Sequence, residues 1–133
     1  MYLLDTNVVS ELRRPRPNAA VVNWLAKVPS EQLYICAMSL GEIQAGVERT
    51  RIQDSQKAKE LEAWLDILSA TQQILPLDGT VCRVWARLIR GKSETLFGDG
   101  LIAACAVVYG LTVVTRNVRD FASLAVKTYN PFA

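Results

Sequence analysis

Four acidic side chains stand beside apolar segments, and they are the residues of this chain most able to do chemistry. They are, in chain order, Asp5, Glu42, Asp99 and Asp120. If three of these carboxylates came within ~6 Å of one another, each pair would repel by roughly 3 kcal/mol at an effective dielectric of about 20. A divalent cation would relieve that repulsion, and an all-oxygen ligand set selects Mg²⁺ or Mn²⁺ over zinc. Such an ion binds phosphates and promotes phosphodiester hydrolysis by water.

Each acid also has a purely local interpretation. Asp5 follows an apolar run and could cap the next turn, a role worth about 1 kcal/mol. Ser39 and Glu42 have the S-x-x-E spacing of a capping box. Asp99 precedes an apolar run as an N-cap residue would, and Asp120 suits a turn or the start of a helix. Singly, these residues do not distinguish capping from chemistry, but the repulsion within a shared cluster would outweigh three caps.

The composition restricts the chemistry further. The chain has no histidine, which excludes Ser-His-Asp and Cys-His catalytic groups, paired-histidine ribonuclease chemistry and most zinc sites. The formal net charge is only +2, so the chain as a whole lacks the electrostatic signature of a nucleic-acid or membrane binder. Catalysis must then use carboxylates, hydroxyls, Lys, Arg or hard metal ions.

The cysteines and apolar segments predict a soluble, cytoplasmic protein. Cys36, Cys82 and Cys105 have no paired spacing and lie among apolar neighbours, so we expect reduced core residues. The N-terminus has no basic segment and reaches Asp5 after a short apolar run, so we expect no secretory signal. The longest apolar stretch, Leu101–Val114, is shorter than the ~20 residues that a spanning helix needs.

Apolar patterning predicts strands that alternate with helices. Short apolar runs indicate strands at Tyr2–Leu4, Leu33–Cys36, Ile74–Leu77, Leu111–Thr115 and Val126–Tyr129. Helical spacing and capping residues indicate helices at about Val21–Leu25, Ser39–Arg51, Asp54–Thr71, Asp78–Arg90 and Asp99–Tyr109. The second and third of these helices should form a hairpin, a loop should cover Gly91–Gly98, and Gly110 should end the last helix.

This alternation predicts a single α/β domain over residues 1–133. We expect a central, mostly parallel twisted sheet of about four to five strands, flanked by helices on both faces. In such sheets the functional crevice lies at the carboxyl ends of the strands. Asp5 and the segment Thr115–Asp120 should both reach that edge, although they are distant in sequence.

Four short motifs give the chain a resemblance to a known family. They are Leu3-Leu4-Asp5-Thr6-Asn7, then Ser39-Leu40-Gly41-Glu42-Ile43, then Gly98-Asp99-Gly100-Leu101-Ile102-Ala103-Ala104, and last Val113-Val114-Thr115-Arg116-Asn117 with Asp120-Phe121. In this order and spacing, over the whole chain, they resemble the PIN-domain ribonucleases, and among them the VapC-like toxins of type II toxin–antitoxin pairs. Gly100 departs from the pattern, because alanine is more usual there.

The resemblance implies that Asp5, Glu42 and Asp99 are metal ligands in a Mg²⁺- or Mn²⁺-dependent endoribonuclease. Our mechanistic hypothesis is that a water activated by the metal attacks the scissile phosphate in line. Cleavage would then leave 5′-phosphate and 3′-hydroxyl ends. Many relatives have an aspartate at the position of Asn117, so the fourth role falls either to Asp120 or to the neutral amide of Asn117.

The resemblance also implies a set of supporting residues around these ligands. Thr6 and Asn7 would hold Asp5 through hydrogen bonds, with Ser39 and Thr115 as further supporting residues. We expect three arginines to bind the RNA backbone, Arg13, Arg14 and Arg116, and the alternative is a solvated surface. Three tryptophans fall on apolar helix faces and predict core packing, or an interface for part of the helical hairpin, namely Trp24, Trp64 and Trp85.

The expected partners follow from the same resemblance. VapC-like toxins usually form homodimers and are inhibited by a small antitoxin that carries the DNA-binding domain. We therefore expect a homodimer, a toxin–antitoxin hetero-oligomer, contact with DNA only through the antitoxin, and no membrane partner. Two alternatives stay open. One is a metal-dependent DNA nuclease or phosphatase that uses the same acids, and the other is a weakly catalytic module that acts through an antitoxin-bound, DNA-binding complex.

Overall fold

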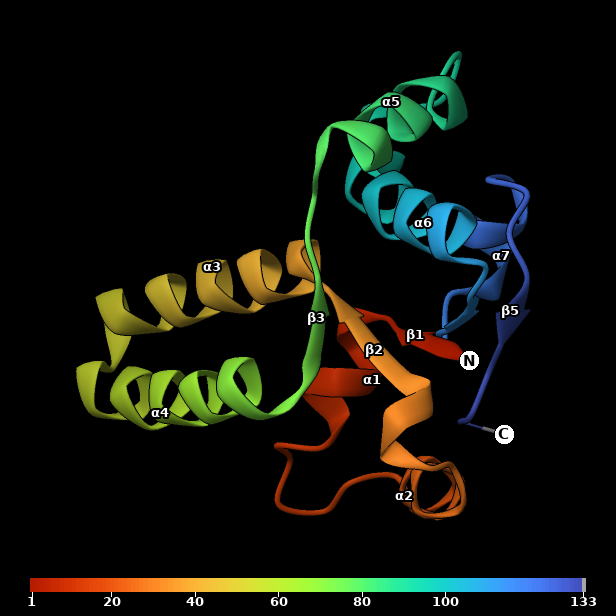
Figure 1. The fold of residues 1–133 in the computed structure, drawn as a ribbon. Helices are drawn as coiled ribbons and strands as arrows, with labels where there is room; N and C mark the ends of the chain where they lie inside the picture. Colours follow the sequence, from red (N-terminus) through yellow and green to blue (C-terminus); the bar gives the residue numbers. More distant parts are fainter. Residues whose placement is uncertain (133) are drawn as a thin grey trace.

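The centre of the molecule is a five-stranded parallel sheet. The computed structural model describes residues 1–132. The strands are β1 (Tyr2–Leu4), β2 (Leu33–Cys36), β3 (Gln73–Leu75), β4 (Thr112–Val114) and β5 (Thr128–Tyr129). Their order in the sheet is β3-β2-β1-β4-β5, and every neighbouring pair is parallel (Figure 1). The carboxyl ends of β1, β2 and β4 are in register, so the residues that follow these strands emerge at one edge.

Helices connect the strands, as parallel pairing requires. They are α1 (Thr6–Glu11), α2 (Ala19–Lys27), α3 (Ala37–Gln53), α4 (Ser55–Thr71), α5 (Gly79–Leu88), α6 (Phe97–Tyr109) and α7 (Val118–Ala122), with short 3₁₀ turns η1 (Ser30–Gln32) and η2 (Glu94–Leu96). Helices α3 and α4 lie side by side as a hairpin that projects beyond the sheet (Figure 1). The predicted α/β fold with a helical hairpin is confirmed.

Two hydrophobic cores lie on opposite faces of the sheet. Successive side chains of a strand point to opposite faces, and Leu3 and Leu4 accordingly belong to different cores. Leu3 packs with residues of α5, α6 and α7, whereas Leu4 packs with residues of α1, α2, α3 and α4. Burial on both faces explains why the strands are almost uniformly apolar.

Several helix boundaries are the ones that the capping residues predict. The Asp54 carboxylate accepts a hydrogen bond from Lys57 N at the start of α4, and the Asp78 carboxylate accepts one from Val81 N at the start of α5. Gly110 ends α6 in the left-handed region, with φ of +67°, which a residue with a Cβ adopts only at a cost. These three boundaries confirm that local hydrogen bonding fixes the ends of the elements.

Two helices begin earlier than the sequence patterns predict. Helix α3 begins at Ala37 and its N-cap is Cys36, so Ser39 lies inside the helix and the predicted capping box is wrong. Helix α6 begins at Phe97, so Asp99 stands in its first turn and the N-cap role predicted for it is also wrong. Because Ser39 does not cap α3, its hydroxyl is available for the tertiary contact with Thr6 Oγ1 at 2.9 Å.

The remaining differences concern short elements and one cysteine. Strand β3 ends at Leu75, before Pro76, which has no N–H for a ladder hydrogen bond. Helices α1 and α7 have too few turns to show apolar periodicity in the sequence, and turn η2 lies inside the predicted loop. Cys36 and Cys105 are buried as predicted, but Cys82 is exposed and is not a core residue. Within residues 1–132, no helix combines the length and apolar character needed to cross a membrane.

Candidate active site

Asp5 lies where β1 passes into α1, at the carboxyl edge of the sheet. Its backbone N–H continues the strand by donating to Val114 O at 2.9 Å, and its carboxylate caps α1 by accepting from Thr6 N at 2.7 Å. The side chain is almost fully buried, with 3% of the residue exposed. Burial raises the pKa of the Asp5 carboxyl, and the hydrogen bonds from Thr115 and Thr6 oppose that rise. A carboxylate this deep is held in one orientation.

Two polar side chains fix the second carboxylate oxygen of Asp5. The Thr115 hydroxyl, which is fully buried after β4, donates to Asp5 Oδ2 at 2.8 Å. The Asn7 amide donates to the same oxygen at 3.1 Å, and its own carbonyl oxygen accepts from Arg116 N at 3.3 Å. The structure therefore brings Asn7 and Thr115 to the acid that they are predicted to support.

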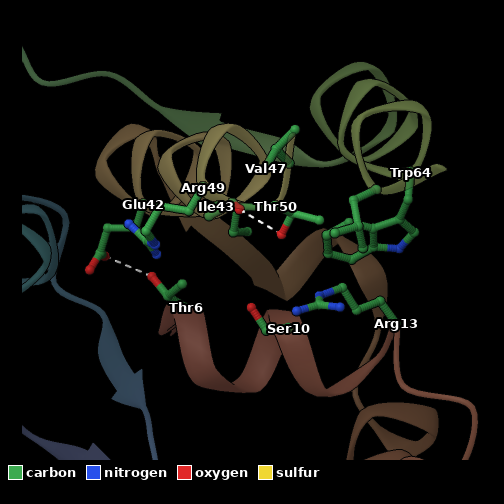
Figure 2. A pocket seen from close by; sticks show the side chains of 11 residues that line it. Thr6, Ser10, Arg13, Glu42, Ile43, Val47, Arg49, Thr50 and Trp64 are labelled. Carbon is green, nitrogen blue, oxygen red and sulfur yellow. Dashed lines mark hydrogen bonds between the residues drawn. The ribbon is translucent and has the colours of Figure 1, made fainter. Parts of the chain in front are cut away.

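Thr6 connects the first helix to the third. Its Oγ1 lies 2.8 Å from Glu42 Oε1 (Figure 2). The same oxygen lies 2.9 Å from Ser39 Oγ. Burial raises the pKa of Glu42, the hydrogen bond from Thr6 opposes the rise, and the charge of Asp5 adds to it. Glu42 is thus held close to Asp5, although the two are separated by most of the N-terminal half of the chain.

Asp99 joins this cluster from the first turn of α6. Burial, and after it the charges of Asp5, Asp120 and Glu42, together raise the pKa of the Asp99 carboxyl to about 6. These charges show that Asp5, Glu42 and Asp120, from three other chain segments, lie near enough to Asp99 to act on its carboxyl group. Their convergence is the geometric condition on which the sequence interpretation depends.

The donor set fits a hydrated Mg²⁺ or Mn²⁺ ion. Within residues 1–132, no three acidic or cysteine side chains are grouped tightly enough to hold one metal ion between them. Mg²⁺, however, usually retains several waters and contacts only one or two protein carboxylates directly. Oxygen donors that repel one another, with one of them deeply buried, suit such an ion. The residues that would hold it, directly or through water, are Asp5, Asp99 and Glu42.

The two candidates for a fourth position both lie next to the cluster, on or beside α7. Asp120 is exposed, and its charge reaches Asp99. Asn117 precedes α7 without a side-chain capping bond, and its backbone N–H donates to Thr115 Oγ1 at 2.9 Å. Asn117 is therefore tied through Thr115 to Asp5, whereas Asp120 acts by charge. The choice between them stays a prediction.

The three arginines predicted to bind RNA differ in their surroundings. Arg14 and Arg116 both reach Glu11, at 3.8 and 3.5 Å, and the Arg116 guanidinium also lies 4.1 Å from the centre of the Phe132 ring. The sequence reading missed Glu11, a buried acid of α1 that also accepts from Asn18 N. No sequence signal identifies it, because its role depends on contacts across the loop. Arg13 makes no ion pair within residues 1–132 and lines a pocket beside Glu42.

The fold and the acid cluster define a class of α/β protein with an oxygen-rich site at the carboxyl edge of a parallel sheet. Residues 2–127 match the family model described as the PIN domain. The chain belongs to the PIN-domain family. Its predicted resemblance to this family is thereby confirmed.

Named relatives span almost the whole chain. It is 37% identical over 140 residues to "Toxin FitB" from Neisseria gonorrhoeae, and the match covers 99% of each protein. It is also 33% identical over 143 residues to "VapC ribonuclease Y4jK" from Sinorhizobium fredii, and this match covers 99% of this chain and 98% of that protein. Among solved structures, it is similar to FitAcB from Neisseria gonorrhoeae, with a TM-score of 0.85, 37% identity and 99% of each chain covered. It is also similar to FitAB bound to an IR36 DNA fragment, with a TM-score of 0.74, 32% identity, and 100% and 96% of the chains covered.

Proposed function

We propose that this chain is a Mg²⁺- or Mn²⁺-dependent endoribonuclease and the toxin of a toxin–antitoxin pair. One observation carries the proposal: Glu42 and the buried Asp5 are both bonded to Thr6, and the charges of both acids act on the half-buried Asp99 carboxyl. A bound cation would offset the repulsion among these carboxylates. Relatives that carry the names toxin and VapC ribonuclease over nearly their full length support the same function.

The residues of the acid cluster have different roles, some in metal binding and some in orienting the ligands. Asp5, buried and fixed by three hydrogen-bond donors, holds the metal in one place, and Asp99 and Glu42 complete the binding site. Thr6 orients Glu42, and Thr115 orients Asp5. A bound Mg²⁺ or Mn²⁺ would supply Lewis acidity toward the phosphate and lower the pKa of the attacking water. Since water attacks rather than the ribose 2′-hydroxyl, the products carry 5′-phosphate and 3′-hydroxyl ends.

Asp5→Asn tests the assignment against a matched exposed acid. RNA and DNA of the same sequence are incubated with the protein in Mg²⁺, in Mn²⁺ and in chelator. We expect metal-dependent RNA cleavage that Asp5→Asn abolishes and that Asp66→Asn, on the exposed side of α4, leaves unchanged. Normal melting of both variants would show that folding is intact. Full activity of Asp5→Asn, or equal cleavage in chelator, would refute the metal-site assignment, and cleavage of DNA alone would favour the DNA-nuclease alternative.

The cellular part of the proposal is a partnership with an antitoxin. A similar chain was solved as the FitAB assembly on a DNA fragment, which supports contact with DNA through a second protein. Inducible expression of the wild-type chain should arrest growth and create new RNA 5′ ends at a recurrent site, and Asp5→Asn should do neither. Co-expression of the cognate antitoxin should restore growth. Growth arrest by Asp5→Asn equal to that by wild type would contradict a toxin that acts by cleavage.

The homodimer is the remaining part of the proposed assembly. Exposed apolar side chains on α2 and α6, such as Val22 and Val107, support an interface between copies or with a partner. Light scattering on the purified chain should give twice the monomer mass. A monomer at micromolar concentration would contradict this part without affecting the nuclease assignment.

A further inference from the structure

A pocket of about 300 Å³ lies between α1 and the α3–α4 hairpin (Figure 2). Its volume is at the lower end of the range of small-molecule sites, so it suits one nucleotide rather than a folded segment. Thr6 and Glu42 form one end of its lining. Because Glu42 is one of the clustered acids and Thr6 is bonded to both Glu42 and Asp5, the pocket lies beside the acid cluster.

The pocket carries two arginines from opposite walls. Figure 2 shows Arg13 on the α1 side with its guanidinium toward the hollow, and Arg49 on α3 with its guanidinium at the end of the pocket that Glu42 lines. Within residues 1–132 neither makes an ion pair, whereas Arg14 and Arg116 share Glu11, and Arg51 pairs with Glu48 and Glu62. Two unpaired guanidiniums flanking a single carboxylate leave the pocket with net positive charge. Their planar donors match the oxygens of a phosphate.

The far wall of the pocket is apolar. Trp64 of α4 and the neighbouring Leu61 supply it (Figure 2). Gly46, which also lines the pocket, has no side chain, and an added Cβ there would stand 3.6 Å from the Arg49 guanidinium. An aromatic wall opposite cations is the arrangement with which proteins take up an unpaired base and its phosphate, because every base has a face that stacks.

From these observations we infer that this pocket binds one nucleotide of a single-stranded RNA segment next to the bond that is cut. Arg13 and Arg49 contact its phosphate, and Trp64 contacts its base. The inference rests on the proposed ribonuclease function and deepens it, since it assigns Arg49 and Trp64 to substrate binding. It also explains why Arg49 remains unpaired on α3 while Arg51, two residues later, is fully paired.

The test measures RNA binding separately from cleavage. The Asp5→Asn protein, which should not cut, is titrated with a fluorescent single-stranded RNA that spans the mapped cleavage site, in Mg²⁺ and at several salt concentrations. Arg13→Gln, Arg49→Gln and Trp64→Leu are added one at a time. Arg87→Gln, an exposed arginine of α5 without an ion pair within residues 1–132, is the matched control. Trp64→Phe retains an aromatic face and tests whether stacking is the contact.

The expected results are specific for each residue. Each pocket arginine variant should lower the slope of log affinity against log salt by about 0.7, because one phosphate contact is lost. Trp64→Leu should weaken binding by about five- to a hundredfold, and Trp64→Phe should recover most of the loss. An RNA that lacks the base at one position beside the cut should lose affinity, and Trp64→Leu should add no further loss with that RNA.

Other outcomes overturn the inference and remain distinguishable from failure of the proposed function. If all three variants bind RNA as the Arg87→Gln control does while the wild-type chain still cleaves RNA, the pocket is not a substrate site and the ribonuclease assignment stands. If the variants instead lose only antitoxin binding, the pocket belongs to the protein partner. If the background protein binds no RNA, the inference is also refuted. Absence of RNA cleavage by the wild-type chain is the separate result that refutes the proposed function.

Discussion

The Thr6 hydroxyl is a single group on which two distant acids depend. It contacts Glu42 Oε1 at 2.8 Å and the fully buried Ser39 hydroxyl at 2.9 Å, while its backbone N–H is bonded to Asp5. A hydroxyl carries one proton, so Thr6 donates its proton to the Glu42 carboxylate. The Ser39 hydroxyl then donates to the Thr6 oxygen. Glu42 is thereby oriented toward the cluster. The contact with Thr6 also explains why a small polar residue, Ser39, is buried within α3.

Replacing Thr6 by valine removes this link while retaining the shape of the side chain. We expect a loss of about 1–3 kcal/mol in the free energy of unfolding, because Ser39 and Glu42 lose a buried partner. RNA cleavage should fall as well, since Glu42 is no longer oriented. Urea denaturation measures the first effect. Thr80→Val, at an exposed position of α5, is the control and should change stability little. Equal effects of both substitutions would contradict the role assigned to Thr6.

Asp99 makes the metal-free protein less stable at neutral pH. Its pKa is raised from the model-peptide value of 3.8 to about 6, so the folded state binds its proton more tightly than the unfolded state does. In chelator, stability should therefore decrease as pH rises from about 4 through about 6 and then remain low. Since Asp99 is half-exposed, we expect an effect of about 1 kcal/mol after solvent screening.

Asp99→Asn should remove that pH dependence. Thermal unfolding in chelator should show the variant to be more stable than wild type above pH 6, with no difference near pH 4, because the wild-type carboxyl is then protonated as well. Asp66→Asn, outside the cluster, should follow the wild-type curve. A variant that is destabilised by the same amount at both pH values would show that repulsion is not what Asp99 experiences.

At the scale of elements, the sequence predicts the strands and the long helices because their signals are local. Apolar runs mark β1 and β2, and the carboxylates of Asp54 and Asp78 mark the starts of α4 and α5. The contact between Asp5 and Thr115 also follows from strand order, because residues after parallel strands meet at one edge. The starts of α3 and α6 are not predictable in this way, since they depend on how each helix meets its neighbours.

Contacts between distant parts of the chain also distinguish arginines that are alike in the sequence. In the sequence, Arg13 and Arg14 are equivalent neighbours in a polar loop. Only the folded chain brings Glu11 to Arg14 and Arg116 and leaves Arg13 at the pocket. Arg49 and Trp64 escaped sequence analysis as substrate contacts because an exposed helical arginine and an apolar-face tryptophan are ordinary features of any helix. Their significance arises from the hairpin, which brings α4 and α3 together against α1.

Gly100 shows how closely α5 and α6 pack. An added Cβ at this buried position would stand 2.7 Å from Ile89 Cγ2 and 3.2 Å from Trp85 Cδ1. An alanine here would therefore clash, although alanine favours helix by about 1 kcal/mol over glycine. Gly100→Ala should destabilise the protein by about 1–3 kcal/mol, measured by chemical denaturation.

Two variants identify close packing as the cause. Gly41→Ala, on the open side of α3 with no heavy atom within 4 Å of the added Cβ, should stabilise by about 0.5–1 kcal/mol. Combining Gly100→Ala with Ile89→Ala should cost less than the sum of the single changes, because the clashing methyl group is removed. Additive losses, or stabilisation by Gly100→Ala alone, would show that Ile89 and Trp85 can move to accommodate the added methyl group without cost.

At the scale of the whole molecule, the acid cluster couples metal binding to folding. Asp5 follows β1, Glu42 lies in α3 and Asp99 in α6, so the site exists only when both cores are assembled. An ion that binds this site but not the unfolded chain stabilises the fold by mass action. Mg²⁺ should therefore raise the melting temperature. The added stability should be about 2.7 kcal/mol when the Mg²⁺ concentration is one hundred times its Kd, and it should grow with the logarithm of that concentration.

The Mg²⁺ titration separates a bound ion from general screening of charge. NaCl at matched ionic strength also weakens the repulsion around Asp99, but it should give only a small shift, because screening requires no site. Asp5→Asn should abolish the part of the Mg²⁺ response that exceeds the NaCl shift, and Asp66→Asn should retain it. Thr6→Val should keep the response but move its onset to higher Mg²⁺ concentration, since Glu42 is then misoriented. If wild type and Asp5→Asn respond identically to Mg²⁺, Asp5 does not hold the metal, and the carboxylates at the edge of this sheet would need another explanation for their proximity.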